Sequence, residues 1–187
     1  MTDSGTKRVA LVIGSGSVKC AAALGLAKVL RREGIDCTML VGCSAGAMFA
    51  AMLATGHDID KAAEMTRRLW TRDITRKPDR RALLSVLLPR LFGFDEQFGL
   101  RHDHLIMQRL REGFGDLAIE DTRIPLFITA TDFANGEQVV MSRGSLVEAV
   151  RASIAMPFIF RPWRIDGRLL VDGFLSDPLP VSAATDA

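Results

Sequence analysis

The segment Gly42-Cys43-Ser44-Ala45-Gly46 constrains the fold most, because it joins two runs of different periodicity. An apolar run of strand length, residues 37–41, precedes it, and a run of small and apolar residues with helical character, 45–55, follows it. We therefore expect a strand, a tight turn and a helix, with the serine at a strained corner and its hydroxyl exposed for nucleophilic attack. Glycines two positions before and after the serine leave room where Cβ atoms would collide.

The rest of the chain alternates strand-length apolar runs with longer helical patterns, which is typical of an α/β domain with a mainly parallel sheet. The other expected strands are 8–13, 124–130, 138–142, 163–165 and 169–171, and the other expected helices are 20–33 and 146–154. Asn135-Gly136 and Asp166-Gly167 predict two hairpin turns. No repeat or linker divides the 187 residues, so the sequence predicts one domain over 1–187.

Composition excludes several classes of protein. A net charge of +2 does not indicate a dedicated nucleic-acid binder. Three cysteines without a Cys-x-x-Cys pair argue against a disulfide framework and favour a reduced, cytoplasmic setting. The apolar run 9–13 is too short for a signal-peptide core or a membrane span, so we expect no insertion across a bilayer.

The segment 57–120 is the least regular part of the chain. Basic residues gather over 67–81, and leucine-rich sequence follows over 83–92. An interfacial segment needs this pattern, because cations meet anionic headgroups while leucines enter the acyl boundary. A solvated charged face beside a core helix explains the same pattern and is commoner. We therefore regard 57–120 as a candidate helical lid or interfacial segment, and 67–92 as a candidate for peripheral membrane contact.

The first glycine loop, Gly14-Ser15-Gly16, has two interpretations. It resembles a dinucleotide-binding loop, but Lys19 stands where that pattern has its third glycine, and no Gly-Lys-Ser/Thr ending follows. Backbone N–H groups at a strand-to-helix turn bind an oxyanion as well as they bind phosphate. With a nucleophile turn one strand later, the oxyanion interpretation is favoured. A nucleotide-binding α/β protein stays as an alternative, which heat-stabilisation by NAD or ATP would reveal.

A nucleophilic serine needs a base, and no histidine is placed for a Ser-His-Asp triad. His57, His102 and His104 all precede the candidate acid, whereas in α/β-hydrolases the histidine follows it. Asp172 is the best candidate base, since Val171-Asp172-Gly173 ends an expected strand, although a turn aspartate is the commoner role of such a residue. With an ordinary pKa of about 3.9, this carboxylate must be positioned against the hydroxyl and shielded from water.

Together these motifs resemble the patatin-like phospholipases, which use a Ser-Asp dyad without histidine. The resemblance runs from about Arg8 to Val181. The serine motif matches the family's nucleophile motif, and Val171-Asp172-Gly173 matches its Asp-Gly-Gly/Ala motif through the first glycine. Further family blocks are Ile124-Pro125, Ala130-Thr131-Asp132 and the run from Ala149 to Pro157.

The resemblance implies a three-layer α/β/α fold and a serine acyl hydrolase that cleaves carboxylic esters of phospholipids or lysophospholipids through an acyl-enzyme. It makes Ser44 the nucleophile and Asp172 the base, and it requires no metal or cofactor. The implied oxyanion donors are the N–H groups of Gly16, Ser17 and Val18, and the implied supporting residues are Lys19, Gly42, Gly46 and Gly173.

Several departures from the family pattern affect the expected activity. The family's Gly-Gly-Gly-x-Arg-Gly loop is here Ser15-Gly16-Ser17-Val18-Lys19-Cys20, so Cβ atoms restrict φ at Ser17 and Cys20, and a lysine replaces the guanidinium fork. Phe174 replaces a small residue after Asp172-Gly173. The chain also ends soon after this motif, so we expect either a shortened chain or a sheet without its last edge elements. The alternative function is a catalytically weak or silent domain that binds lipid or a protein partner.

Overall fold

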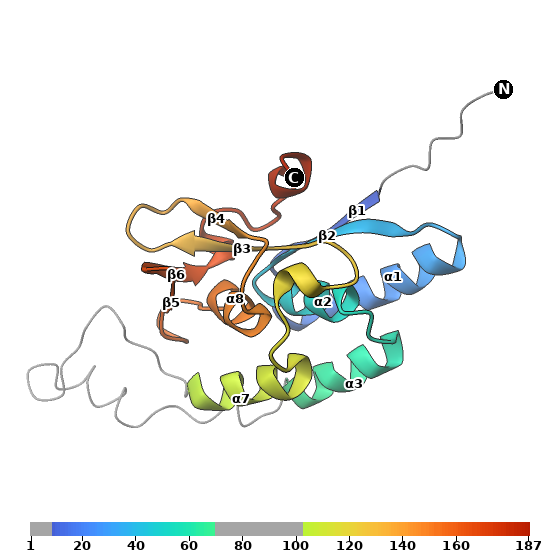
Figure 1. Ribbon diagram of the computed structural model, residues 1–187, viewed down its shortest axis with the longest axis horizontal. Coiled ribbons are helices and arrows are strands. Elements are labelled where there is room, and N and C mark those ends of the chain that lie inside the picture. Colours follow the sequence, from blue (N-terminus) through green and yellow to red (C-terminus); the bar gives the residue numbers. More distant parts are fainter. Residues whose placement is uncertain (1–8, 70–102) are drawn as a thin grey trace, which may run out of the picture.

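The computed structural model describes residues 9–69 and 103–187, which form a six-stranded sheet with helices around it (Figure 1). The strand order is β1-β2-β3-β6-β5, and β4 also pairs with β3. β1, β2 and β3 are parallel, whereas β4, β5 and β6 join by antiparallel pairing. This confirms the predicted α/β class with a parallel centre. The strands are β1 (Val9–Ile13), β2 (Cys37–Cys43), β3 (Leu126–Asp132), β4 (Gln138–Met141), β5 (Trp163–Ile165) and β6 (Arg168–Asp172).

Helices lie on both faces of the sheet (Figure 1). α2 and α8 pack directly on one face, and α3 and α7 lie side by side beneath them. In the described part of the chain the other face carries α9. The helices are α1 (Ala22–Arg32), α2 (Ala45–Ala54), α3 (Ile59–Leu69), α7 (Asp103–Phe114), α8 (Leu146–Ser153) and α9 (Ser182–Thr185), with 3-10 turns at Ser17–Ala21, Ile119–Asp121 and Gly173–Leu175.

The core is centred on α2, in which every residue is buried. A helix that is apolar all round belongs inside a domain, and its five alanines and one glycine let neighbouring elements approach closely. Phe49 and Met52 are fully buried between the sheet and the outer helices. Burial of each such side chain contributes about 1.5–3 kcal/mol to the stability of the fold. α2 therefore holds the layers together, and it also carries the serine turn at its start.

The register of β3 brings two distant parts of the sequence together. Thr129 pairs with Cys43 at the end of β2, and the next residue, Ala130, pairs with Asp172 at the end of β6. Because β2 runs parallel to β3 and β6 runs antiparallel, the carboxyl ends of β2 and β6 face each other. Residues 44 and 172 therefore meet at one place on the sheet.

Several element boundaries differ from the sequence predictions. The helix expected over 20–33 starts as a 3-10 turn, in which the N–H of Lys19 donates to the carbonyl of Gly16, and becomes α-helical at Ala22. β2 continues two residues beyond Val41, because Gly42 and Cys43 still pair with β3. β3 starts and ends two residues later than expected, and its last residues pair with β4 and β6. The Asp166-Gly167 hairpin is confirmed, with φ of 48° and 80° as a two-residue turn requires.

The segment 57–120 is only partly described. α3 and α7 confirm helices at its two sides, whereas residues 70–102, which contain most of the basic and leucine-rich stretch, lie outside the described residues. No helix found within 9–69 or 103–187 combines the length and apolar character needed to cross a membrane.

Candidate active site

Ser44 occupies a strained turn between β2 and α2. Its φ of 54° and ψ of −129° lie in a region that non-glycine residues rarely adopt. The flanking glycines are needed for space: a Cβ on Gly42 would lie 2.5 Å from the Cα of Ala47, and one on Gly46 would lie 2.2 Å from the carbonyl oxygen of Ile13. The serine turn is therefore pressed against the end of β1.

The Ser44 hydroxyl points at a carboxylate. Ser44 Oγ donates a hydrogen bond of 2.8 Å to Oδ2 of Asp172, and Oδ1 of Asp172 accepts a bond of 2.9 Å from the N–H of Phe174. The expectation of an exposed hydroxyl is wrong: Ser44 is only 9% exposed, because its side chain turns toward Asp172, which is itself 1% exposed. The carboxylate is shielded from water, as a base of this type requires.

The environment of Asp172 makes it a stronger base than an ordinary aspartate. Burial raises the pKa of its carboxyl to about 6, and the hydrogen bonds from Phe174 N–H and Ser44 Oγ–H oppose that rise. At neutral pH the carboxyl is ionised and accepts the Ser44 proton in its hydrogen bond. The pair can therefore act as nucleophile and general base without a third residue.

The loop after β1 lies beside the serine turn. A Cβ on Gly46 would also meet the Gly14 carbonyl oxygen at 2.4 Å, so the turn and the loop are in contact. The N–H of Ser15 donates to the carbonyl of Pro178. Among the described residues, the N–H groups of Gly16, Ser17 and Val18 donate to no backbone carbonyl outside the 3-10 turn. All three residues are exposed, as is Lys19, so these donors are available to an anion.

The altered residues of this loop have defined conformations. Ser17 holds a left-handed φ of 56°, which costs a non-glycine residue free energy but keeps the turn. The thiol of Cys20 donates to the carbonyl of Gly14 at 3.2 Å and so braces the loop from inside. Phe174 is 47% exposed, which leaves its ring at the surface beside the carboxylate.

Sequence reasoning missed the residues that hold the pair in place. Ser153, Thr131 and the backbone of Ala155 make hydrogen bonds to Ser44 or Asp172. Ser153 and Ala155 belong to the block 149–157, which the resemblance marked without giving it a role. Their contacts span up to 109 positions along the chain, so no local pattern could reveal them.

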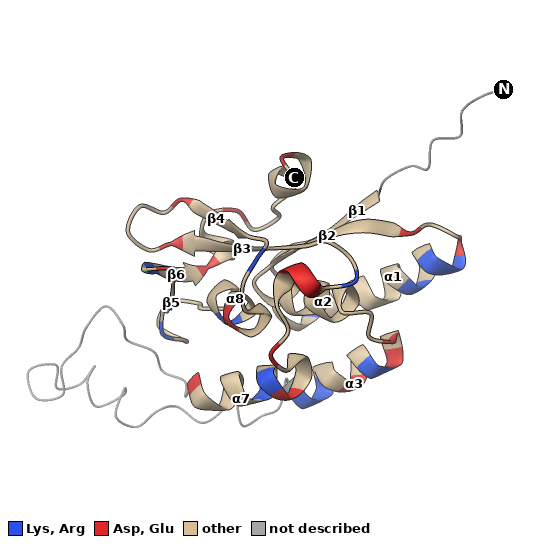
Figure 2. Cartoon of the chain, in the orientation of Figure 1, with Lys and Arg blue, Asp and Glu red and all other residues tan. Residues whose placement is uncertain are grey.

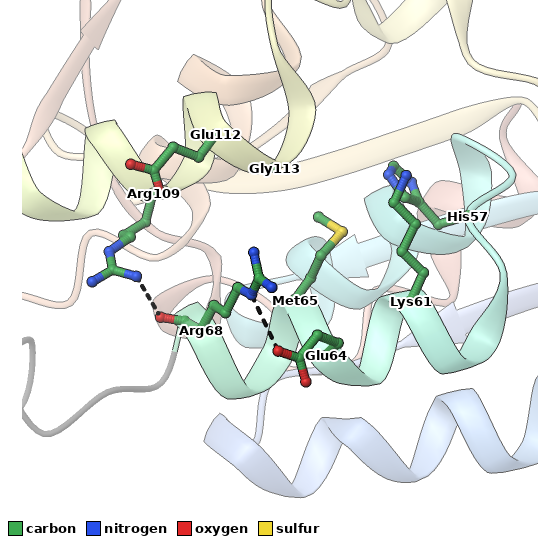
Figure 3. Close-up of a pocket in the computed structure, with 8 residues that line it drawn as sticks. All are labelled: His57, Lys61, Glu64, Met65, Arg68, Arg109, Glu112 and Gly113. Atoms are coloured by element: carbon green, nitrogen blue, oxygen red, sulfur yellow. Dashed lines mark hydrogen bonds and ion pairs between the residues drawn. The ribbon is translucent and has the colours of Figure 1, made fainter.

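His57 lies away from the Ser44–Asp172 pair. His57 borders a groove of about 260 Å³ between α3 and α7, shown in Figure 3, whose other lining residues are Lys61, Glu64, Met65, Arg68, Arg109, Glu112 and Gly113. Burial, and then the charge of Lys61, lowers the pKa of His57. None of the predicted site residues lines this groove, and its two walls, α3 and α7, carry charges of both signs (Figure 2). Within 9–69 and 103–187, no three His, Cys, Asp or Glu side chains gather to hold a metal ion.

Comparison with known proteins shows the family of this chain. The family model described as "Patatin-like phospholipase" matches residues 11–185, and the chain belongs to that family. An uncharacterised NTE family protein of Mycobacterium tuberculosis is 36% identical over 179 residues, which are 96% of this chain and 46% of that protein. The neuropathy target esterase of Drosophila melanogaster is 30% identical over 176 residues, 92% of this chain and 12% of that protein. The chain thus spans less than half the length of these relatives.

Two solved structures share the fold. VipD from Legionella pneumophila superposes with a TM-score of 0.53 at 19% identity, covering 96% of this chain and 52% of VipD. The type III effector protein ExoU superposes with a TM-score of 0.50 at 18% identity, covering 79% of this chain and 40% of ExoU. At these identities the likeness concerns the fold alone.

Proposed function

We propose that the chain hydrolyses carboxylic esters of lipids, with Ser44 as nucleophile and Asp172 as general base. The observation that carries the proposal is the 2.8 Å hydrogen bond from Ser44 Oγ to a buried carboxylate, at a strained strand-to-helix turn. Membership of the patatin-like phospholipase family and similarity to a neuropathy target esterase support a lipid ester, phospholipid or lysophospholipid, as the substrate class.

The proposed reaction uses groups of this chain and water. Asp172 accepts the Ser44 proton as Oγ attacks the ester carbonyl carbon, and the N–H groups of Gly16, Ser17 and Val18 donate to the resulting oxyanion. The carbon–oxygen bond to the alcohol breaks, and the alcohol leaves with the proton held by Asp172. Water then attacks the acyl carbon as Asp172 accepts its proton, the bond between that carbon and Ser44 Oγ breaks, and Asp172 returns the proton to Oγ as the fatty acid is released.

A weak or silent domain that binds lipid or a protein partner is the second candidate. Ser17 and Cys20 replace family glycines in the oxyanion loop, and Ser17 keeps its left-handed φ only at an energetic cost. Since one missing oxyanion donor typically lowers the rate by about 10²- to 10³-fold, a small displacement of this loop is enough to produce such a protein.

Peripheral membrane contact through 67–92 is part of the proposal. Two basic residues of that segment are described, Arg67 and Arg68. They are exposed near the end of α3, where both pair with Glu64. Binding to vesicles with and without anionic lipid tests it, since a basic segment requires the anionic lipid.

Fatty-acid release from mixed phospholipid and lysophospholipid vesicles tests the function. The wild type should release fatty acid, and Ser44→Ala and Asp172→Asn should both abolish release while the protein stays folded. Folded wild type that releases none but binds vesicles would favour the silent domain. Release that survives Ser44→Ala would contradict the assigned nucleophile.

A further inference from the structure

The carboxyl end of α8 contacts both halves of the proposed dyad. We propose that Ser153, the last residue of α8, is a positioning residue that sets Ser44 in register with Asp172. This inference rests on the proposed function, because it concerns how the same pair is held. It gives a role to a residue that itself contacts no reacting atom.

The hydrogen bonds of Ser153 are fixed by its chemistry. Its Oγ lies 2.6 Å from the carbonyl oxygen of Thr129 and 2.8 Å from the backbone nitrogen of Ser44. A hydroxyl has one hydrogen, which goes to the carbonyl, so the oxygen accepts from the Ser44 N–H. Ser153 is fully buried, and no water competes for either bond. The nucleophile's backbone is thereby tied to β3 through one side chain.

The same end of α8 holds the base. The carbonyl of Ala155, two residues after Ser153, accepts a 3.0 Å bond from the Asp172 N–H. On the opposite side, Thr131 Oγ1 donates a 2.8 Å bond to the Asp172 carbonyl. Asp172 is thus bonded both to the segment 153–155 and to β3, whereas Ser44 is bonded to Ser153, which in turn is bonded to Thr129 of β3.

Thr129 is the point where these contacts converge. Its carbonyl accepts from Ser153, and a Cβ on Gly173 would lie 2.6 Å from the same oxygen. The peptide after Asp172 therefore rests against the group that anchors Ser153. A displacement of Ser153 changes the position of Ser44 relative to Asp172, since Asp172 keeps its own bonds to Ala155 and Thr131.

The bond also limits the oxyanion donors. Because the Ser44 N–H is occupied by Ser153, it is not available to an oxyanion, which leaves the proposed donors of the loop 16–18. Ser153 has two effects: it stabilises the strained φ of Ser44, and it keeps the Ser44 N–H from needing another partner.

Three variants test the role of Ser153 in vesicle hydrolysis. Ser153→Ala should lower kcat by about 10²-fold with little change in KM, because the substrate still binds while the nucleophile is misplaced. Ser153→Thr keeps the hydroxyl and should restore at least part of the activity. Ser145→Ala is the matched control: it removes the serine at the start of the same helix, which accepts from the Glu148 N–H and touches neither Ser44 nor Asp172.

Hydrogen exchange of the Ser44 amide provides a readout that does not depend on activity. Ser153→Ala should speed this exchange, and Ser145→Ala should leave it unchanged. Unchanged exchange in Ser153→Ala, or kcat within about threefold of wild type, would overturn the inference. Wild type that releases no fatty acid would overturn the proposed function instead, and the exchange rates would still decide whether Ser153 holds the serine turn.

Discussion

At the scale of single residues, the pKa of Asp172 determines the pH range in which the proposed dyad can act. Burial raises that pKa to about 6, and the base must be ionised to accept a proton. We expect kcat/KM to be constant above about pH 7 and to fall about tenfold per pH unit below pH 6. Initial rates on a soluble short-chain ester between pH 4 and 9 measure this. A plateau that continues down to pH 4.5 would show a base with an ordinary aspartate pKa.

Gly46 and Gly25 form a matched pair of glycine substitutions. Gly46→Ala places a methyl group 2.2 Å and 2.4 Å from two backbone oxygens, so α2 or the oxyanion loop must shift, and we expect a loss of roughly 3 kcal/mol or more in unfolding free energy together with activity. Gly25→Ala meets nothing within 4 Å on exposed α1 and should stabilise by roughly 0.5–1 kcal/mol. Urea unfolding compares the two. Equal effects would contradict the packing described for Gly46.

The structural role of a residue could be predicted from the sequence where a short local motif defines it. The strained turn at Ser44 and its flanking glycines follow from a five-residue pattern, and the strand end at Asp172 follows from a three-residue one. Ser153 and Thr131 could not be predicted in the same way, because a buried serine or threonine fits many core positions. Only the fold shows which backbone groups their hydroxyls reach.

At the scale of elements, Arg151 joins α8 to α7. Its fully buried guanidinium pairs with Asp103 at the start of α7, donates to the carbonyl of Arg161, and lies 5.4 Å and 5.0 Å from the ring centroids of Phe160 and Trp163. Burial lowers the pKa of Arg151, and the ion pair with Asp103 opposes that shift. The arrangement is a cation held between two aromatic rings and one carboxylate.

Loss of this buried cation should loosen the contact between the two helices. We expect Arg151→Ala to lower the unfolding free energy by about 3–5 kcal/mol, because it leaves a hole and an unpaired carboxylate. Arg151→Lys should recover only part of the lost unfolding free energy, since an ammonium group lacks the planar fork of the guanidinium. Urea unfolding of both variants, with the exposed Arg143→Ala as control, measures the difference. An Arg151→Ala protein as stable as wild type would contradict this role.

Strands with alternating apolar residues and turns with typical turn residues could be predicted from the sequence. Helices and strand pairings that depend on packing between distant segments could not. The hairpin at Asp166-Gly167 needs only local turn chemistry. α3 was hidden within a charge-rich segment, because among its residues of described burial only Ala62 and Thr66 are buried. The antiparallel addition of β6 to a parallel centre depends on pairing with residues of β3 that lie 38 to 42 positions earlier, which no local window contains.

At the scale of the whole molecule, the carboxylate proposed as the base lowers the stability of the fold at neutral pH. The pKa of Asp172 is about 6 in the folded chain and near 3.8 when exposed, so the folded state binds the proton more tightly. The protonated carboxyl therefore adds to the free energy of unfolding below about pH 3.8, and this contribution is lost as the pH rises through about 6. Asp172→Asn should therefore be more stable than wild type at pH 7.5, by up to about 3 kcal/mol, and similar to it near pH 4.

Chemical denaturation at the two pH values tests this coupling. The difference between variant and wild type, rather than either value alone, isolates Asp172 from other titrating groups. A difference that does not change with pH would mean that the carboxyl is not held at a raised pKa. It would also remove the basis for the expected activity profile.

The meeting of β2 and β6 on neighbouring residues of β3 also determines when the proposed chemistry becomes available. The serine turn depends on strands near the start of the chain, whereas its carboxylate arrives with the hairpin of β5 and β6, synthesised more than a hundred residues later. A chain in which β6 has not yet joined β3 carries the proposed nucleophile without its proposed base. The proposed hydrolysis therefore requires the hairpin of β5 and β6 to be in place, and its separation from β3 would carry Asp172 away from Ser44.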